Sequence, residues 1–437
     1  MPASASCPAL DLLTDLPDTA RDAVLAAVRD QPGQLAVELA GVGDGRKPRG
    51  RRHPLLPILM VAIWAVLGGA RSYVAIAEQW RHCADHLHIG AAGTWWAPLL
   101  KSGAPSMWTI RLALCKLDVA ALEAAVCRWA TGQALAAVDA ARAATGTARR
   151  RAAELRLVIS IDGKTLRGTI NAAGEQVALV AIMEHATRTI LTQAAIVAGD
   201  EIAAARTALS QLAEVLDFSG GEGGAGVLVT GDALHTQRPL ATWLAEQGGH
   251  YLFRVRGNHP TLEHYARSRA WKQVPSTRVY TRAHGRRESR TIRVLSLTQA
   301  QSAGIAHLMG GVAQVIAITR TRAPLDGEAT AARKPIKTSR ETVYYVTSLS
   351  AHEADPALLA TWIRDHWALE NGVHYVRDVT FCEDASRVRT GVGPQVMAAL
   401  RNLAITLHRL AGQTNIAAAC REHAHQPAAS LEVVLAA

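Results

Sequence analysis

Residues 155–162 read LRLVISID, and residues 227–232 read VLVTGD. Each stretch begins with apolar and β-branched residues, which is typical of a buried strand, and each ends at an aspartate. The strands are predicted to end just before Asp162 and before the Gly231-Asp232 pair. If they lie in one sheet, the two carboxylates can lie side by side. Such a pair repels unless it shares a proton or binds a cation.

Strands and helices alternate around these two stretches. The sequence between them contains two more strand-like runs, a helix-like run and a glycine-rich loop, and another helix follows the second aspartate. This order predicts an α/β core. The predicted strands are 155–161, 177–184, 189–196 and 227–230, the predicted helices are 200–216 and 240–247, and the loop is 220–226.

The segment from residue 250 to residue 350 is predicted to be rich in strands, with few helices between them. Between Arg254 and Arg293 it contains eleven lysines and arginines but only two acidic residues, Glu263 and Glu288. Such a surface suits contact with a phosphate backbone, and a merely solvated sheet face is the alternative. The predicted strands are 251–255, 278–282, 291–297, 312–319 and 342–349.

The first 150 residues are predicted to be helical. Segment 55–70 is uncharged and strongly apolar, but it is shorter than the ~20 residues that cross a bilayer, so a buried core helix is favoured over a membrane span. The basic connector 41–53 is either a solvated linker or an arm that contacts phosphate. No signal peptide is predicted at the N-terminus. The predicted helices are 11–29, 55–70, 111–130 and 133–154, followed near the C-terminus by 358–378 and 396–410.

The composition narrows the class of partner. The 437 residues include 47 Lys and Arg against 37 Asp and Glu, a net charge of +10. This surplus favours nucleic acid or an anionic membrane surface. None of the six cysteines forms a C-x-x-C pair, so reduced thiols in a cytoplasmic protein are expected.

Glu370 lies on the helix predicted at 358–378. On a helix His366, Glu370, Asn371 and His374 recur at three- and four-residue steps, so they are predicted to share one face. A third carboxylate from this helix would complete a magnesium site with Asp162 and Asp232, because Mg²⁺ prefers carboxylate oxygens, waters and phosphates. The alternatives remain open: each aspartate can be a turn or capping residue, and Glu370 can be a solvated helix position.

Several segments together resemble the DDE transposases of bacterial insertion sequences, in the H-repeat-associated, ISAs-type branch. The similarity runs in the expected order from about residue 35 to residue 410. The matching segments are 50–55 (GRRHPL), 69–73 (GARSY), 161–168 (IDGKTLRG), 231–237 (GDALHTQ), 251–262 (YLFRVRGNHPTL), 284–286 with Glu288, 366–375 (HWALENGVHY), 378–381 (DVTF) and 383–386 (EDAS).

The resemblance implies a ribonuclease-H-like mixed-sheet core with a β-rich insertion and an N-terminal helical domain. It implies that Asp162, Asp232 and Glu370 hold two Mg²⁺ ions, with Mn²⁺ able to substitute. The expected activity is cleavage and strand transfer at the ends of the element. The expected partners are duplex DNA, namely terminal inverted repeats and target, and further copies of the chain in a dimer or larger complex. The implied domains are 1–150 (helical, DNA-binding), 151–249 (first part of the core), 250–350 (insertion) and 351–437 (helical end of the core).

Candidate DNA contacts come from the basic and histidine residues near these motifs, each with an ordinary surface or core role as its alternative. Related transposases carry Tyr, Arg, Glu and Lys around the last carboxylate, where this chain has Ile363, His366, Glu370 and Arg377, so the handling of DNA ends is expected to differ. The candidates are Lys164, Arg167, His235, Arg254, Arg256, Arg286, His366, Arg377, Arg51 and Arg52.

Four further residues have two possible roles. Glu383 and Asp384 can support the metal site or, as we prefer, cap a helix. Trp367 and Tyr375 can stack on a base, although core packing is expected of at least one. Three other functions remain as alternatives: an inactive, transposase-derived DNA-binding protein, a phosphohydrolase of small molecules, and a membrane-associated protein.

Overall fold

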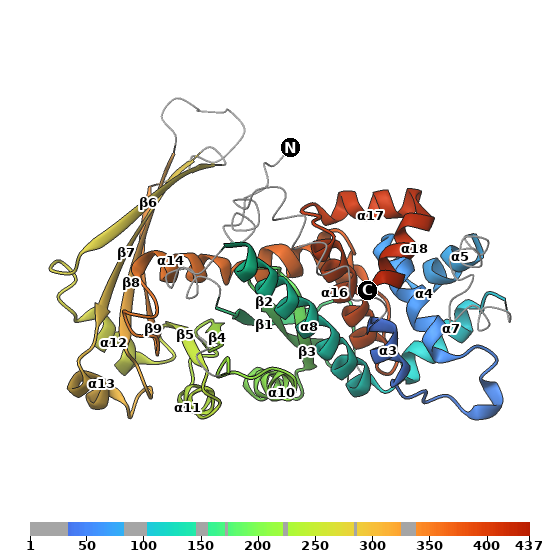
Figure 1. Cartoon of the computed structure of the whole chain (residues 1–437), viewed down its shortest axis with the longest axis horizontal. Coiled ribbons are helices and arrows are strands. Elements are labelled where there is room, and N and C mark those ends of the chain that lie inside the picture. The colour runs from blue at the N-terminus through green and yellow to red at the C-terminus, as the bar shows by residue number, and fades with distance from the viewer. Residues whose placement is uncertain are drawn as a thin grey trace. The chain divides into compact units, whose positions relative to one another are not determined.

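The computed structural model describes residues 34–82, 103–145, 156–170, 174–221, 226–283, 286–324 and 338–437 (Figure 1). The predicted helix 11–29 lies outside them. The described chain forms two compact units. The first comprises residues 156–160 and 217–366, and the second comprises residues 34–145, 161–216 and 367–437. One cut falls between residues 145 and 156, near the boundary expected at 150, whereas the cuts after residues 160, 216 and 366 do not coincide with the boundaries expected near 250 and 350.

The strands form one mixed sheet in the order β3-β2-β1-β4-β5-β9-β8-β7-β6. Strand β1 (Val158–Leu166) gives its first residues to the first unit and the rest to the second. Within the first unit, β4 (Leu228–Gly231) runs parallel to β5 (His250–Val255), and β5 runs antiparallel to β9 (Ser339–Thr347). The mixed α/β class expected from the sequence is therefore confirmed.

The strand-rich segment is an antiparallel extension of this sheet. Strands β6 (Ser276–Ala283), β7 (Arg286–Ser296) and β8 (Gln314–Pro324) pair in succession, and β8 pairs with β9. All five strands predicted between residues 250 and 350 are present. Two short helices among them, α12 (Pro260–Arg267) and α13 (Gln299–Ile305), were not predicted.

Helix α14 (Pro356–Asp365) covers one face of the sheet in the first unit. Asp355 begins the helix by accepting hydrogen bonds from the backbone N–H groups of Ala357 and Leu358, both at 2.9 Å, and Pro356 occupies the first turn, where no N–H is needed. Its apolar side packs against strand residues. The buried cluster joins Leu359, Trp362 and Ile363 of α14 to Val158, Leu228, Leu252, Ile292, Ile316, Ile318 and Tyr345 of the strands, and to Leu349 and Ala354. This unit also contains α11 (Arg238–Glu246), in addition to α12 and α13.

In the second unit, β2 (Val177–Glu184) and β3 (Ile190–Ala195) form the hairpin expected from the sequence. Helix α10 (Glu201–Ala213) contacts both strands and begins at Asp200, whose carboxylate caps the N–H of Ala203. Helix α16 (Gly393–Leu410) also packs on this hairpin, with Ala398 against Leu166 and Leu179. The further elements of this unit are α3 (Gln34–Ala40), η1 (Pro48–Gly50), α5 (Tyr73–His82), α17 (Ile416–His425) and α18 (Pro427–Ala436).

Helix α4 (Leu55–Leu67) is the buried core helix expected at 55–70, with twelve buried residues. No helix in the described ranges is both long and apolar enough to span a membrane. One expected break is wrong. Helix α7 (Met107–Lys116) ends early, and α8 (Val119–Thr145) continues through Gly132, because Thr131 and Gln133 are buried on its packed side and tertiary contacts outweigh the low helix propensity of glycine.

Glu123 on α8 is buried, and its Oε1 accepts hydrogen bonds from Gln193 Nε2 at 3.1 Å and Gln395 Nε2 at 2.7 Å. Burial raises the pKa of Glu123 to about 7, against the lowering effect of these two donors. Folding therefore favours the protonated acid. The resulting stability is complete below the ordinary pKa of 4.5 and is lost as pH rises towards 7.

We expect Glu123→Gln to stabilise the protein above pH 7, because a glutamine keeps the acceptor oxygen and removes the buried charge. The gain is of the order of 3 kcal/mol from the size of the pKa shift. Urea unfolding of both proteins between pH 4 and pH 8 measures it. If the difference in the free energy of unfolding between the two proteins does not shrink towards low pH, Glu123 does not have the raised pKa.

Candidate functional site

Asp162 lies inside β1 rather than after it. The sequence predicted that the strand ends at Ile161, but the ladder continues to Leu166. Asp162 is partly exposed, with 28% of its side chain accessible, while Ile161 and Leu166 are fully buried. A Cβ atom at Gly163 would collide with the carboxylate of Glu201, so glycine allows α10 to approach the strand here. The carboxylate is therefore presented from a rigid, well-packed strand.

Glu370 and His374 lie on a short π-helical segment, η3 (Glu370–His374). The continuous helix expected at 358–378 is wrong, because α14 ends at Asp365, a turn follows, and α15 (Tyr375–Val379) begins only after η3. π-helical turns are rare and frequently occur at functional sites.

The second unit brings Asp162, Glu370 and His374 together. His374 Nδ1 lies 3.0 Å from Glu370 Oε2 and 3.4 Å from Asp162 Oδ2. One ligand atom from each residue lies within 4.8 Å of the other two. His374 is buried and Glu370 is largely exposed, so the cluster has a fixed wall and an open side. His374 was not predicted as a ligand, although its position four residues after Glu370 was the available signal.

The electrostatics of the cluster favour an ionised Glu370. The hydrogen bond with His374 lowers the pKa of Glu370 and outweighs its partial burial, and the charges of His374 and Lys164 add to the effect. Two carboxylates and one imidazole within this distance fit a divalent cation. Mg²⁺ prefers the oxygen ligands, and imidazole also suits transition metals.

Lys164 follows Asp162 by two residues on the same strand. It was predicted to contact phosphate, but its side chain is buried, and its Nζ lies 2.7 Å from Asp378 Oδ2 on α15. The ammonium therefore joins β1 to the helix after η3 and offsets part of the negative charge. Its structural role is to hold the two halves of the cluster together.

Asp232 follows β4 in the first unit. Its Oδ1 accepts hydrogen bonds from the backbone N–H groups of Leu234 at 2.9 Å and His235 at 3.2 Å. These bonds match the turn role that the sequence left open as an alternative. Two residues before each aspartate, Ser160 Oγ and Thr230 Oγ1 lie 3.1 Å apart. The metal-binding role of Asp232 stays a prediction.

His366 lies at the end of α14, with its Nδ1 3.0 Å from Thr230 Oγ1. Burial lowers the pKa of His366 to about 4, although the nearby charge of Asp232 raises it. The imidazole is therefore neutral at neutral pH. It can donate a hydrogen bond to a phosphate but carries no positive charge there.

The other residues predicted to contact DNA differ in burial and in their partners. His235 and Arg377 are fully buried, and Arg377 Nε donates to Glu383 Oε2 at 2.7 Å, so its predicted contact with DNA is not supported. Arg51 is folded back, with its guanidinium on the backbone oxygens of Asp44 and Arg46. The remaining candidates are Arg52, Arg167 and Arg256, which are exposed, Arg254, which lies 3.8 Å from Glu341, and Arg286 on β7.

Two further expectations are wrong. Glu383 and Asp384 neither cap a helix nor join the metal cluster: Glu383 is buried between Arg377 and Arg401, and Asp384 lies 3.7 Å from Arg167. Trp367 and Tyr375 are 50% and 61% exposed, so neither packs in the core. Both remain suited to stacking on a base.

The strand-rich extension separates its charges between two faces. On one face Glu288 pairs with Arg290, Arg320 and Arg322. The strand pairing places other arginines and a tyrosine on the opposite face, and no Asp or Glu lies among the strand residues paired there. This exposed basic face consists of Arg278, Tyr280, Arg282, Arg287 and Arg340.

Comparison with known proteins places this arrangement in a family. Residues 154–407 match the family described as the transposase DDE domain, and residues 37–130 match the family described as associated with it. The YncI protein of Escherichia coli O157:H7, which carries a transposase name, is 24% identical over 383 residues, spanning 84% of this chain and 85% of that protein. The H repeat-associated YhhI protein of Escherichia coli K12, also named as a transposase, is 28% identical over 258 residues, spanning 57% of this chain and 63% of that protein.

A solved structure of the piggyBac transposase synaptic complex with hairpin DNA covers 94% of this chain and 78% of its own, with 10% identity and a TM-score of 0.34. The assignment therefore rests on the sequence matches. Because the DDE domain match covers more than half of the chain, this chain belongs to the transposase DDE domain family, among the transposases of bacterial insertion sequences.

Proposed function

We propose that this chain cuts DNA strands at the ends of a bacterial insertion sequence and joins them to target DNA in a metal-dependent reaction. The observation that carries the proposal is the cluster of Asp162, Glu370 and His374, held within 4.8 Å in a chain of the DDE family. We further propose that Asp232 joins the site, that the mixed sheet is a ribonuclease-H-like core, and that two ions bind.

Each residue has a distinct task in this proposal. Asp162 and Glu370 supply carboxylate oxygens, and the buried imidazole of His374 fixes the orientation of both. Lys164 keeps η3 and α15 close to β1 through Asp378. Mg²⁺ or Mn²⁺ bound here would stabilise the charge that develops on the phosphoryl group. The reaction is a displacement at phosphorus, so positioning and charge stabilisation supply most of the catalysis.

The DNA partner is proposed to lie partly on the basic face of β6–β9. Five exposed residues there offer four guanidinium groups and one aromatic ring, with no carboxylate among the paired strand residues. Because both ends of an element must be handled together, the active complex is proposed to contain at least two copies of the chain.

Cleavage of DNA that carries the ends of the encoding element tests the function. We expect nicked and joined products with Mg²⁺ or Mn²⁺ and none with a chelator. Binding of the ends without cleavage under either metal would contradict the proposal and favour an inactive DNA-binding descendant. Cleavage of small phosphate esters in place of DNA would favour a phosphohydrolase.

The double variant Arg278→Gln/Arg282→Gln is expected to weaken binding of duplex DNA and flatten its salt dependence. Each lost phosphate contact lowers the slope of log affinity against log salt by ~0.9. Titration at several salt concentrations measures the slope. The control is Arg128→Gln/Arg421→Gln, which removes the same charge elsewhere, and an equal effect in the control would refute a contact at this face.

A further inference from the structure

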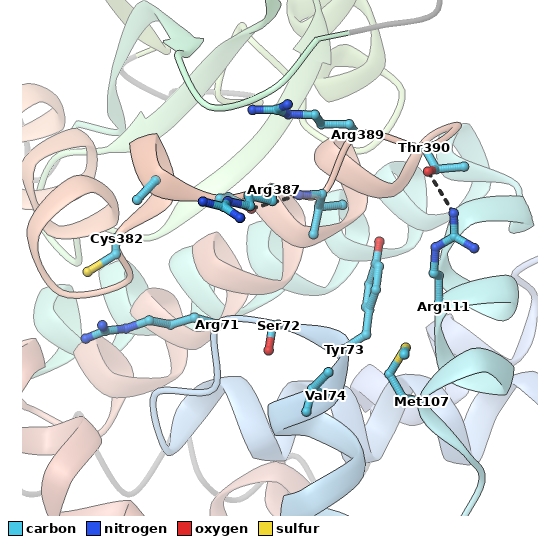
Figure 2. Close-up of a pocket in the computed structure, with 13 residues that line it drawn as sticks. Arg71, Ser72, Tyr73, Val74, Met107, Arg111, Cys382, Arg387, Arg389 and Thr390 are labelled. Atoms are coloured by element: carbon cyan, nitrogen blue, oxygen red, sulfur yellow. Dashed lines mark hydrogen bonds between the residues drawn. The ribbon is translucent and has the colours of Figure 1, made fainter.

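A pocket of about 520 Å³ lies within the second unit, and none of the metal cluster residues lines it (Figure 2). Its walls come from the start of α5, from α7, and from the loop between η4 (Glu383–Ala385) and α16. A volume of this size is in the range of small-ligand sites, ~300–1,000 Å³. It has room for one nucleotide and is too small for a base-paired duplex.

The pocket is lined by four arginines and no acidic residue. Arg111 donates to Thr390 Oγ1 at 2.9 Å, and Arg389 donates to the backbone oxygen of Gly168 at 2.9 Å. Arg71 and Arg387 are exposed, and within the described part of the chain no group accepts a hydrogen bond from either guanidinium. In Figure 2 the side chains of Arg71 and Arg387 extend towards the same side of the pocket. Two guanidinium groups at one recess, neither with a hydrogen-bond acceptor among the described residues, favour an anion, and phosphate above all.

The remaining wall suits a sugar and base. Val74, Met107 and Val388 give apolar surface beside the arginines. Trp108, at the start of α7, is not itself a lining residue, but it is 66% exposed and its ring centre lies 5.6 Å from the guanidinium of Arg111, which lines the pocket. An exposed tryptophan next to a cationic recess is a stacking platform for an unpaired base.

The shape of the pocket is fixed by close packing. Gly391 adopts φ +53°, and a Cβ atom there would press on the backbone oxygen of Cys115. A Cβ atom at Gly393 would press on the hydroxyl of Tyr73. Both glycines thus let the loop lie directly on α5 and α7. Because Arg389 also ties the loop to the turn after β1, the pocket is a preformed site.

We propose that this pocket binds one nucleotide of an unpaired DNA strand, with its phosphate on Arg71 and Arg387 and its base near Trp108. The inference rests on the proposed function, because it assigns a place for a strand that has been separated from its duplex. It concerns residues outside the metal cluster and can be tested without cleavage.

The test compares binding of a short single-stranded oligo(dT), a blunt duplex of the same length and a thymidine mononucleotide in the presence of EDTA. We expect Arg71→Gln/Arg387→Gln to weaken binding of the strand at least about tenfold, because two charged hydrogen bonds are lost. The salt slope for the strand should fall by ~0.7, because one phosphate contact is lost. Binding of the duplex should change less than about twofold, and Arg128→Gln/Arg421→Gln should match the wild type.

Three outcomes would overturn the proposal. Equal weakening for strand and duplex would mean a general basic surface, and equal weakening in the control would mean a net-charge effect. A mononucleotide that binds as tightly as the strand would mean a small-ligand site. Circular dichroism and melting temperature of each variant separate a folding defect from lost binding. EDTA prevents cleavage, so the binding result does not depend on whether the protein cuts DNA. If the protein cleaves DNA but Arg71→Gln/Arg387→Gln binds the single strand as the wild type does, the pocket proposal fails and the proposed function stands.

Discussion

Glu370→Gln is expected to lower the rate of metal-dependent DNA cleavage about a thousandfold, because bound metal contributes several kcal/mol of charge stabilisation and ~1.4 kcal/mol corresponds to a factor of ten. The amide keeps the size of the side chain but loses the negative oxygen that faces His374 Nδ1 at 3.0 Å. Single-turnover cleavage of labelled element ends measures the rate. Asp162→Asn is expected to have the same effect for the same reason.

Binding of DNA should survive both changes, because Glu370 and Asp162 carry no charge that attracts phosphate. The matched control is Glu214→Gln, an exposed glutamate at the end of α10 in the same unit. Its cleavage rate should equal that of the wild type. If Glu370→Gln cuts as fast as the wild type, the cluster does not hold the catalytic metal.

The third ligand can be resolved by comparing His374→Gln with Asp232→Asn. The structure groups His374 with Asp162 and Glu370, whereas resemblance to the family selects Asp232. If His374 is a ligand, His374→Gln weakens Mn²⁺ binding directly in a titration without DNA. If His374 only orients the carboxylates, its change to glutamine lowers Mn²⁺ affinity by about 10- to 100-fold, as is typical of supporting residues. In that case added metal restores cleavage.

Local patterns predicted the strands well because each strand contains a run of β-branched, aromatic or apolar residues, which favour extended backbone. The predicted strand 177–184 has the observed bounds of β2, since its run of apolar residues ends at Glu184, where the turn begins. The five strands after residue 250 were found for the same reason. Strand β1 was predicted too short because polar residues after Ile161 suggested a loop, whereas pairing within the sheet keeps them extended.

The site was predictable only in part. Asp162 and Glu370 were found through motifs, and the four-residue step placed His374 on the face of Glu370, but no local pattern shows that this face meets Asp162, which lies far away in the sequence. The buried role of Glu383 was missed because its partner Arg401 lies eighteen residues away on another helix. The arginine pocket combines segments far apart in the chain, and no local pattern links Arg71 to Arg387.

Glu383→Gln is expected to cause the largest loss of stability. Glu383 is fully buried, with Oε2 2.7 Å from Arg377 Nε and Oε1 2.8 Å from Arg401 Nη1. The change leaves two buried guanidinium groups without a counter-ion, and breaking a buried pair in this way costs about 3–5 kcal/mol. In the described residues neither Arg377 Nη2 nor Arg401 Nη2 has an acceptor, and Arg377 keeps only the neutral acceptor Asn402 Oδ1, 3.3 Å from its Nη1. The free energy of unfolding in urea measures the loss.

The pH dependence identifies the cause. Burial raises the pKa of Glu383, but the charges of Arg377 and Arg401 outweigh it, and the net pKa is below 4.5. A lowered pKa gives stability that is present above pH 4.5 and is lost as pH falls through the folded value. The difference in the free energy of unfolding between the wild type and Glu383→Gln should therefore become smaller at acidic pH. The control is Asp384→Asn, whose partner Arg167 is 77% exposed, and it should cost less than about 1 kcal/mol. If Asp384→Asn lowers the free energy of unfolding as much as Glu383→Gln does, the loss comes from a disturbed loop and not from the ion pairs.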